Sequence, residues 1–512
     1  MANPKTLRLI LGDQLNINHS WFQEINPDVV YVMMEIRAES EYVHHHIQKI
    51  ACFFSAMRSF RDALTEMGHR VIYIQISDTV NEHSFEGNLR RLIESETINR
   101  FEYQLPDEYR LDQLLSSMGE SLGIPTIATD SEHFLSKREG VSEHFGSKNP
   151  LMESFYRMMR RKYNIMMESG KPIGRQWNFD ADNRKKYKGN PPVPLPPAFE
   201  NNLQAIVEEI ETANLPFIGK ADYGLEFWPV TRKQSLELLQ HFTEHLLPWF
   251  GTFQDAMTLN EPFVFHSRLS FAMNVKLLHP LEVIEAAVQC LENDPATYSL
   301  NQVEGFVRQI LGWREFMRGI YWKEMPEFAT LNYFKHQRAL PEFFWTGNTK
   351  MACVKAAVKQ SLNLAYAHHI QRLMITGNFA LLAGIDPAEV DAWYLGIYAD
   401  AIEWVQLPNT RGMSQFADGG IVGTKQYVSS ANYIHKMSDY CKGCSYDRKL
   451  KYGPKACPFN SLYWQFYERN RDKLGNNPRI GMMYRVWDRN PEEEKNRILN
   501  QADEYLSNLE KL

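Results

Sequence analysis

The chain has 512 residues, which is too long for one small core and predicts two domains or more. Its 44% hydrophobic and 23% charged residues are typical of a soluble globular protein and exclude a largely disordered chain. The net charge of −6 excludes a uniformly basic nucleic-acid coat, although a local basic face remains compatible with it. No apolar run approaches the roughly 20 residues of a membrane span. Six cysteines are too few for a disulfide framework, so we expect a cytoplasmic protein with no membrane contact.

Residues 1–135 alternate between short β-rich apolar runs and helical patterns, which predicts a parallel, Rossmann-like sheet with helices on both faces. We expect strands at 7–11, 29–34, 71–76, 100–104 and 126–128, and helices at 45–67, 88–96 and 111–122. The first run is too short for a signal-peptide core. The fold class is therefore α/β in this part.

Two acidic residues follow apolar strands of the predicted sheet. The turn Gly12-Asp13-Gln14 is not the G-x-G-x-x-G dinucleotide fingerprint, so a ligand bound here need not be NAD. Asp13 and Glu39 each come just after a strand, where ligands of parallel sheets bind. They are candidate ligand contacts, although spacing alone is equally compatible with helix caps.

The remaining chain has a different pattern. Residues 136–200 contain a short basic helix, expected at 151–167, and a proline run at 191–197, so we expect an interdomain linker there. Basic residues such as Arg184 and Lys185 are candidate phosphate contacts, and the simpler interpretation is solvated surface. Residues 201–512 show helical spacing almost throughout, including a long helix at 354–374, and predict a large all-helical domain.

The sharpest motif is Cys441-x2-Cys444-x12-Cys457-Pro458, within a region of about 430–470. Two thiolates three residues apart can bind one metal, and a third follows within a short loop. Cys353 lies far upstream and is a candidate fourth ligand. Four sulfurs form either a structural zinc site or an iron–sulfur cluster. The proline after Cys457 favours the cluster, but the spacing leaves both metals open.

Three further segments carry a family resemblance. His266-Ser267-Arg268-Leu269-Ser270, with Leu278-His279-Pro280 after it, resembles the Thr-Ser-x-Leu-Ser…Leu-Ser-Pro signature of cryptochromes and photolyases. Gly312-Trp313-Arg314-Glu315-Phe316 resembles the Trp-Arg-Glu-Phe helix of that family. Ala367-His368-His369-Ile370-Gln371-Arg372 resembles the His-His-x-x-Arg element of (6-4) photolyases. With the four cysteines, the chain resembles the iron–sulfur bacterial branch of the family along essentially its whole length.

The resemblance implies three cofactors and one substrate. Family members bind FAD in the helical domain, a [4Fe–4S] cluster near the C-terminus, and a 6,7-dimethyl-8-ribityllumazine antenna in the α/β domain. The implied substrate is damaged DNA that carries a (6-4) pyrimidine–pyrimidone lesion, repaired under blue light, and the implied oligomeric state is a monomer. The cluster ligands would be Cys353, Cys441, Cys444 and Cys457.

The resemblance also assigns roles to single residues. Repair needs a proton donor, and a histidine suits that role because its ordinary pKa lies near the working pH. We expect His369 to donate and His368 to support it, although the two roles can be exchanged. The other assignments are as follows: FAD contacts at His266, Ser267, Leu269, Ser270, Gln309, Arg314, Arg372, Asp400 and Glu403; electron transfer through Trp393, Tyr394 and Trp345; antenna contacts at Asp13 and Glu39; and lesion or DNA contacts at Tyr427, Met413, Arg184 and Lys185.

Two residues differ from the family pattern, and three alternative functions remain open. His266 stands where the family signature has threonine, and Tyr394 stands where many photolyases have tryptophan in the electron path. A signalling cryptochrome would share fold and cofactors, although it would not need both His368 and His369. A light-independent iron–sulfur DNA-binding protein would lack flavin, and cyclobutane-dimer repair does not use the histidine pair. The sequence therefore favours a (6-4) photolyase, a lyase of the carbon–carbon class.

Overall fold

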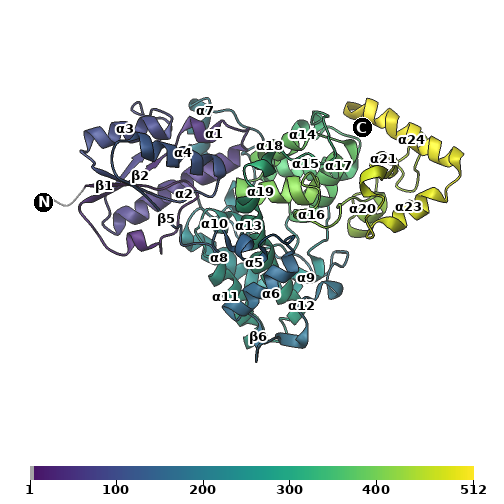
Figure 1. The fold of residues 1–512 in the computed structure, drawn as a ribbon, viewed down its shortest axis with the longest axis horizontal. Coiled ribbons are helices and arrows are strands. Elements are labelled where there is room, and N and C mark those ends of the chain that lie inside the picture. The colour runs from purple at the N-terminus through teal and green to yellow at the C-terminus, as the bar shows by residue number, and fades with distance from the viewer. Residues whose placement is uncertain (1–4) are drawn as a thin grey trace.

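The computed structural model describes residues 5–512. Its N-terminal part holds a five-stranded parallel sheet with the strand order β3-β2-β1-β4-β5 (Figure 1). The strands are β1 (Thr6–Leu9), β2 (Val29–Met34), β3 (Val71–Ile74), β4 (Arg100–Gln104) and β5 (Thr126–Thr129). The strand order reverses at β1, between β2 and β4, so the carboxyl ends of these strands form the crevice where open α/β sheets bind ligands.

Helices cover this sheet as the alternating pattern predicts. They are α1 (Arg37–Ser40), α2 (Ile47–Glu66), α3 (Phe85–Ser95) and α4 (Tyr109–Ser121). All six residues of β2 are buried, which fits a central strand covered on both faces. The predicted α/β class and the five strand positions are confirmed: β2 and β4 agree at both ends, and the ends of the other strands differ by at most two residues.

The segment that follows the sheet is more structured than a plain linker. It contains α5 (Gly140–Phe145), α6 (Met152–Tyr163) and a two-stranded hairpin of β6 (Met167–Glu168) and β7 (Lys171–Pro172) that the sequence did not predict. The predicted basic helix ends earlier than expected, because Asn164 takes a left-handed backbone that caps α6. Arg160 of this helix is fully buried and donates to backbone carbonyls, so it is not a solvated surface charge.

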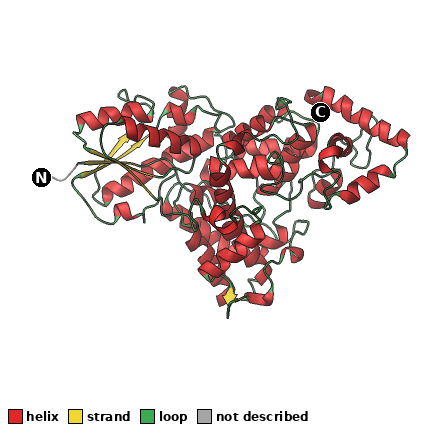
Figure 2. Ribbon diagram, viewed as in Figure 1, coloured by secondary structure: helices red, strands yellow, loops and turns green. Residues whose placement is uncertain are grey.

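Beyond residue 200 the described chain consists of helices and loops, with isolated bridges as its only β pairing. Figure 2 shows the strands near the N-terminus and in the small hairpin. The helices are α7 (Leu203–Thr212), α8 (Arg232–His241), α9 (Leu247–Phe253), α10 (Ser270–Asn274), α11 (Pro280–Asn293), α12 (Leu300–Val307), α13 (Glu315–Glu324), α14 (Phe343–Thr346), α15 (Ala352–Leu364), α16 (His369–Gln371), α17 (Asn378–Ala383), α18 (Pro387–Ile397), α19 (Glu403–Leu407), α20 (Ala431–Met437), α21 (Pro458–Arg469), α22 (Arg471–Leu474), α23 (Gly481–Asp488) and α24 (Glu492–Ser507). Among the described helices, none is both long and apolar enough to cross a membrane.

The predicted single helix over 354–374 is wrong. Helix α15 ends at Leu364, and Ala365 takes a left-handed backbone with φ of 49°. The chain then turns and starts α16, with His368 at the N-cap position, and continues as a π-helical segment over Arg372–Gly377. Single π-helical turns are frequent at functional sites. The break therefore places the histidine pair at the start of a helix rather than in the middle of one.

The sheet part and the helical part meet closely at the segment that leads into α2. His46 N donates to Gly396 O over 2.9 Å. The Lys49 ammonium donates to the carbonyls of Leu395 and Ala401, each over 2.7 Å. A Cβ atom placed on Gly396 would lie 2.2 Å from His44 O. Only glycine leaves room for this backbone contact.

We predict that Gly396→Ala lowers the free energy of unfolding by about 1–3 kcal/mol, because the added methyl group overlaps a backbone carbonyl that cannot rotate away. Gly481→Ala is the matched control, since Gly481 also lies in a helix and has open space around its Cα. That control is expected to be neutral or slightly stabilising. Urea unfolding of both variants checks this, and equal stability of the two would contradict the close contact.

Candidate functional site

A buried ion pair connects α16 with the loop after α18. The Arg372 guanidinium lies 2.9 Å from Asp400 Oδ1. Ser270 Oγ donates to Asp400 Oδ2 over 2.6 Å, and Asn274 donates to Asp400 O over 2.7 Å. Burial opposes the charge of Arg372, but Asp400 outweighs it and raises the pKa of the arginine. The arrangement holds one fixed cation and one fixed anion at the start of the His-His-x-x-Arg helix.

Three histidines gather beside this pair. The rings of His266 and His368 are stacked, with centroids 4.4 Å apart and 14° between the planes. His368 is buried, and Nε2 of both rings has no well-aligned hydrogen-bond partner among the described residues, although the backbone at Gln254 and Ala256 approaches the rings. Unpaired buried polar atoms cost free energy, so these nitrogens point to a ligand or to water.

His369 differs from the stacked pair because its side chain is accessible. It exposes more than a third of its surface, yet burial is the main cause that lowers its pKa to about 4. These two facts agree if His369 lies deep in a concave site that is open to solvent. Arg372 lowers the pKa further, because a nearby cation disfavours a second positive charge.

The other two histidines are also shifted downward. Burial and the charge of His369 lower the pKa of His266 to about 4, and burial places the pKa of His368 well below its ordinary value. All three imidazoles are therefore neutral at pH 7 in the DNA-free protein. The ordinary histidine pKa, on which the expectation of a proton donor depended, does not apply to this state.

A chain of aromatic rings leads away from the ion pair. Tyr398 lies under Arg372, with the guanidinium carbon 3.8 Å from the ring centre. The ring centroids of Tyr398 and Tyr394 are 5.5 Å apart, and those of Tyr394 and Trp393 are 5.3 Å apart. Trp345 is 38% exposed and follows Phe344, whose ring packs against Trp393 at 5.2 Å. The three predicted aromatic residues thus lie between the ion pair and the surface, and Tyr398 is a member that the sequence reasoning missed.

The remaining predicted flavin contacts are dispersed. Leu269 is buried and Ser267 Oγ accepts from Leu269 N, while Gln309 is exposed and donates back to Gly305 O. Arg314 bonds to His133 and packs between Phe134 and Trp404 rather than against Arg372 or Asp400. Glu403 accepts from Tyr321 over 3.0 Å, and burial together with the charge of Glu108 raises its pKa to about 7. Of the predicted flavin contacts, Ser270 donates directly to the carboxylate of the ion pair, and Asn274, which had not been predicted, donates to the backbone of Asp400.

The four predicted metal-ligand cysteines line one small cavity of about 20 Å³. Cys353 lies in α15, whereas Cys441, Cys444 and Cys457 lie in the loop between α20 and α21. Burial raises the pKa of Cys457 to about 12 and that of Cys353 well above its ordinary value. Among the described residues, no three His, Cys, Asp or Glu side chains are arranged to hold a single metal ion. Four thiols around one cavity are a donor set that suits either a zinc ion or an iron–sulfur cluster.

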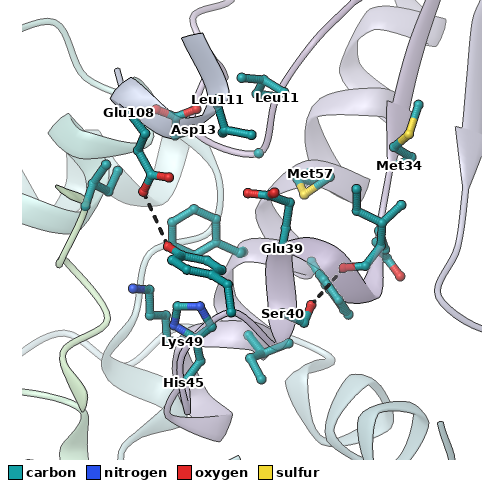
Figure 3. A pocket seen from close by; sticks show the side chains of 18 of the residues that line it. Leu11, Asp13, Met34, Glu39, Ser40, His45, Lys49, Met57, Glu108 and Leu111 are labelled. Atoms are coloured by element: carbon teal, nitrogen blue, oxygen red, sulfur yellow. Dashed lines mark hydrogen bonds between the residues drawn. The ribbon is translucent and has the colours of Figure 1, made fainter. Parts of the chain in front are cut away.

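A cavity of about 130 Å³ lies at the carboxyl ends of the strands. Both predicted antenna residues, Asp13 and Glu39, line it, and Figure 3 shows their carboxylates on one side with Lys49 on the other. Ala401 and Ile402 also line it, so the helical part completes the cavity. Asp13 and Glu39 are thus in the same site, at the switch point where such folds bind ligands.

Three acidic residues of this cavity differ in their partners and in their pKa. Burial raises the pKa of Asp13 to about 6, although Lys276 lies 3.2 Å away and opposes the shift. Glu39 forms a two-pronged ion pair with Arg110, with both distances 2.8 Å. Burial also raises the pKa of Glu108, which accepts from Tyr42. Glu108 follows β4 just as Asp13 follows β1, so the strand-end rule that found Asp13 would also have found it.

The predicted DNA contacts lie in different settings. Tyr427 is half-buried and Met413 is buried. Arg184 is exposed but already pairs with Asp180 at 2.7 Å and with Asp255 at 3.7 Å. Lys185 is exposed. Lys185 is therefore available to a phosphate, whereas Arg184 would have to share its charge with two carboxylates.

Comparisons with known proteins find relatives along nearly the whole chain. Residues 8–224 match the family described as deoxyribodipyrimidine photo-lyase-related protein. A (6-4) photolyase of Agrobacterium fabrum is 44% identical over 510 residues, which are 98% of this chain and 99% of that protein. A class III photolyase structure from Agrobacterium tumefaciens has a TM-score of 0.57 at 14% identity and covers 97% of this chain and 92% of its own. A Synechocystis cryptochrome structure has a TM-score of 0.58 at 14% identity, over 97% of this chain and 94% of its own.

Parallel-sheet and helical parts arranged in this way define a photolyase-type fold, which the two structural matches share with this chain. The chain belongs to the cryptochrome and photolyase family. Within it, the full-length relationship is to the (6-4) photolyase of Agrobacterium fabrum. The family predicted from three short motifs and four cysteines is confirmed.

We predict that Asp400→Asn destabilises the fold by about 3–5 kcal/mol, because it leaves the buried Arg372 charge without its carboxylate. The control is Glu493→Gln, which removes a carboxylate from the exposed pair with Arg497 and is expected to leave stability unchanged. Urea unfolding measures both. Wild-type stability of Asp400→Asn would contradict the structural role of the ion pair.

Proposed function

We propose that this protein is a DNA repair enzyme that uses blue light to reverse (6-4) pyrimidine–pyrimidone photoproducts. The 44% identity to a (6-4) photolyase over nearly the whole of both chains supports this substrate. The observation that carries the proposal is the juxtaposition of His368 and His369 with the Arg372–Asp400 pair. We propose the division that the sequence indicates, with an antenna domain at 1–135, a linker at 136–200 and a catalytic domain at 201–512.

FAD fits the donor set of the catalytic domain. Arg372 and Asp400 would hold the ring system, with Ser270 orienting the Asp400 carboxylate and Asn274 fixing the Asp400 backbone. The other contacts proposed from the resemblance are His266, Ser267, Leu269, Gln309, Arg314 and Glu403. When bound, FAD supplies the light-driven electron for the lesion. A fixed guanidinium beside it stabilises negative charge, because opposite charges attract strongly in a buried site. Trp393, Tyr394 and Trp345 are the proposed path for electrons from the surface.

Within the same site, His369 is the proposed proton donor. It is accessible, whereas His368 is buried against His266 and serves as its neighbour in the wall of the site. Because burial, and after it the charge of Arg372, hold the pKa of His369 low, the donor needs negative charge nearby before it can carry an extra proton. The phosphates of bound DNA supply that charge, so proton donation is tied to the presence of substrate.

Photolyases are among the enzymes that take their target nucleotide out of the base stack. Tyr427 and Met413 are the proposed walls for the extruded lesion. Lys185, with its free ammonium, and Arg184 are the proposed phosphate contacts. A damaged step unstacks at lower cost than an intact one, which adds to selectivity. The proposed enzyme acts as a monomer in the cytoplasm.

The four-cysteine cavity fits a [4Fe–4S] cluster held by Cys353, Cys441, Cys444 and Cys457. Such a cluster would join α15 to the loop before α21. The nearest two of its ligands across this gap, Cys353 and Cys441, are 88 residues apart in the sequence. Thiolates are the ligands that bind iron–sulfur clusters, and cation binding keeps them deprotonated despite their burial. The cavity at the strand ends fits 6,7-dimethyl-8-ribityllumazine, because its carboxylates can accept hydrogen bonds from the ribityl hydroxyls.

Fold similarity alone does not separate repair from signalling, since the photolyase and the cryptochrome structures match equally well. The full-length (6-4) photolyase relative and the histidine pair favour repair. A light-independent DNA-binding protein has no support from these relatives.

We predict that His369→Ala lowers light-driven repair of a (6-4) lesion by roughly 10²-fold or more, the usual size of a general-acid contribution. Flavin content and light-driven flavin reduction should remain at wild-type levels, because the His369 side chain is exposed and forms no hydrogen bond with another described residue. His245→Ala, at an exposed histidine of the outer surface, is the control and should repair normally. Undiminished repair by His369→Ala would remove its assignment as donor.

We predict that Cys444→Ala yields protein with less iron and lower solubility, because the cluster joins segments that are distant in the sequence. Cys290→Ala, a partly buried thiol in α11 outside the cavity, should retain full iron content. Iron and sulfide analysis of the purified variants measures this. Soluble Cys444→Ala protein with full iron would contradict the ligand assignment.

A further inference from the structure

A buried lysine of the helical part reaches the strand-end cavity. The Lys276 side chain has no exposed surface, and its ammonium lies 2.7 Å from Asp107 Oδ2 and 3.2 Å from Asp13 Oδ2. It also donates to Asp13 O over 2.6 Å. An ammonium has three N–H groups, and these three oxygens match them in number. A buried charge persists only when it is paired and hydrogen-bonded in this way.

The position of Lys276 in the chain makes this contact unusual. It lies between α10 and α11, 263 residues beyond Asp13. Its backbone is left-handed, with φ of 68°, a conformation that is unfavourable for a residue with a side chain. The adjacent Val275 O accepts from Leu15 N over 3.1 Å. The segment is therefore clamped onto the loop after β1, and the strained backbone directs Lys276 toward Asp13.

Asp13 is otherwise surrounded by acidic groups. Asp107 and Glu108 both face it and disfavour its ionised form. In the described part of the chain, Lys276 is the one cation whose nitrogen lies within 4 Å of the Asp13 carboxylate. Arg318 and Arg138 act on Asp107 instead. Without Lys276, Asp13 would be a buried carboxyl next to two others.

We propose that Lys276 is a positioning residue of the strand-end cavity, where it keeps the Asp13 carboxylate ionised and oriented toward the hydroxyl groups of a bound ribityl lumazine. The inference rests on the proposed antenna site and adds a residue from the other domain to it. Antenna binding in the sheet part then depends on correct docking of the helical part, because the helical part supplies the charge that holds Asp13.

The test is a double-mutant cycle on the flavin-loaded full-length chain. Affinity for added 6,7-dimethyl-8-ribityllumazine is measured at pH 7 for the wild type, Lys276→Met, Asp13→Asn and the double variant. We expect each single substitution to weaken binding about tenfold or more, and Lys276→Met to have almost no further effect in the Asp13→Asn background. Independent effects that multiply in the double variant would overturn the proposal.

Lys49→Met is the matched control. Lys49 is also a buried lysine between the two parts. Its ammonium donates to Leu395 O and Ala401 O, and it forms no hydrogen bond or ion pair with Asp13. Its effect on lumazine affinity should be the same in the wild-type and Asp13→Asn backgrounds. Non-additivity of Lys49→Met with Asp13→Asn would contradict a specific role for Lys276, since any loss of docking would then act in the same way.

A second variant keeps the test decisive if Lys276→Met does not fold. Lys276→Gln retains a donor of similar length without the charge. Lumazine binding should fall on the acid side with a midpoint near pH 6 in the wild type, where Asp13 becomes protonated. In Lys276→Gln the pKa of Asp13 rises, so binding should already be lost at higher pH; an unchanged profile would overturn the proposal.

The two levels of the hypothesis fail differently. If the wild type does not bind lumazine, the antenna assignment is wrong, and the role of Lys276 toward a ligand falls with it. If the wild type binds but the cycle is additive, the antenna assignment stands and only the role of Lys276 is wrong. Flavin content of each variant, measured by absorbance, reports separately on the catalytic domain.

Discussion

The docking of the sheet part onto the helical part is the constraint on which both candidate sites depend. Two buried lysines cross the boundary in opposite directions: Lys49 reaches helical carbonyls, and Lys276 reaches Asp13 and Asp107. Each ammonium is held by buried hydrogen bonds or ion pairs, because an unpaired buried ammonium would be costly. Lys49 is influenced by both Glu108 of the cavity and Asp400 of the ion pair. The cavity and the proposed flavin site are thus electrostatically connected through the interface.

Charge in the proposed active site is set by one cation and its paired carboxylate. Arg372 is balanced by Asp400, and the three imidazoles beside it are neutral because burial and this cation oppose their protonation. Under the proposed mechanism, a neutral histidine is a weak acid, so proton donation by His369 would follow the arrival of negative charge with the substrate.

The sequence predicted the sheet well because its strands are short, apolar and separated by clear helical periods, as in the fully buried β2. It brought Asp13 and Glu39 to one cavity and four cysteines to another through strand-end position and thiol spacing. It failed at the 354–374 helix, because no local pattern marks Ala365 as left-handed. Lys276 and Tyr398 were missed for a related reason: their roles come from contacts across hundreds of residues or across a core, which periodicity does not encode.

The most direct test of the account is a light-versus-dark repair assay with pre-reduced, flavin-loaded protein. One oligonucleotide carries a single (6-4) lesion, and a second carries a cyclobutane dimer. The account predicts light-dependent restoration of the (6-4) substrate alone, because the site pairs an accessible histidine with the Arg372–Asp400 ion pair. Failure to repair the (6-4) lesion in protein that holds its flavin would contradict the account and favour a photoreceptor.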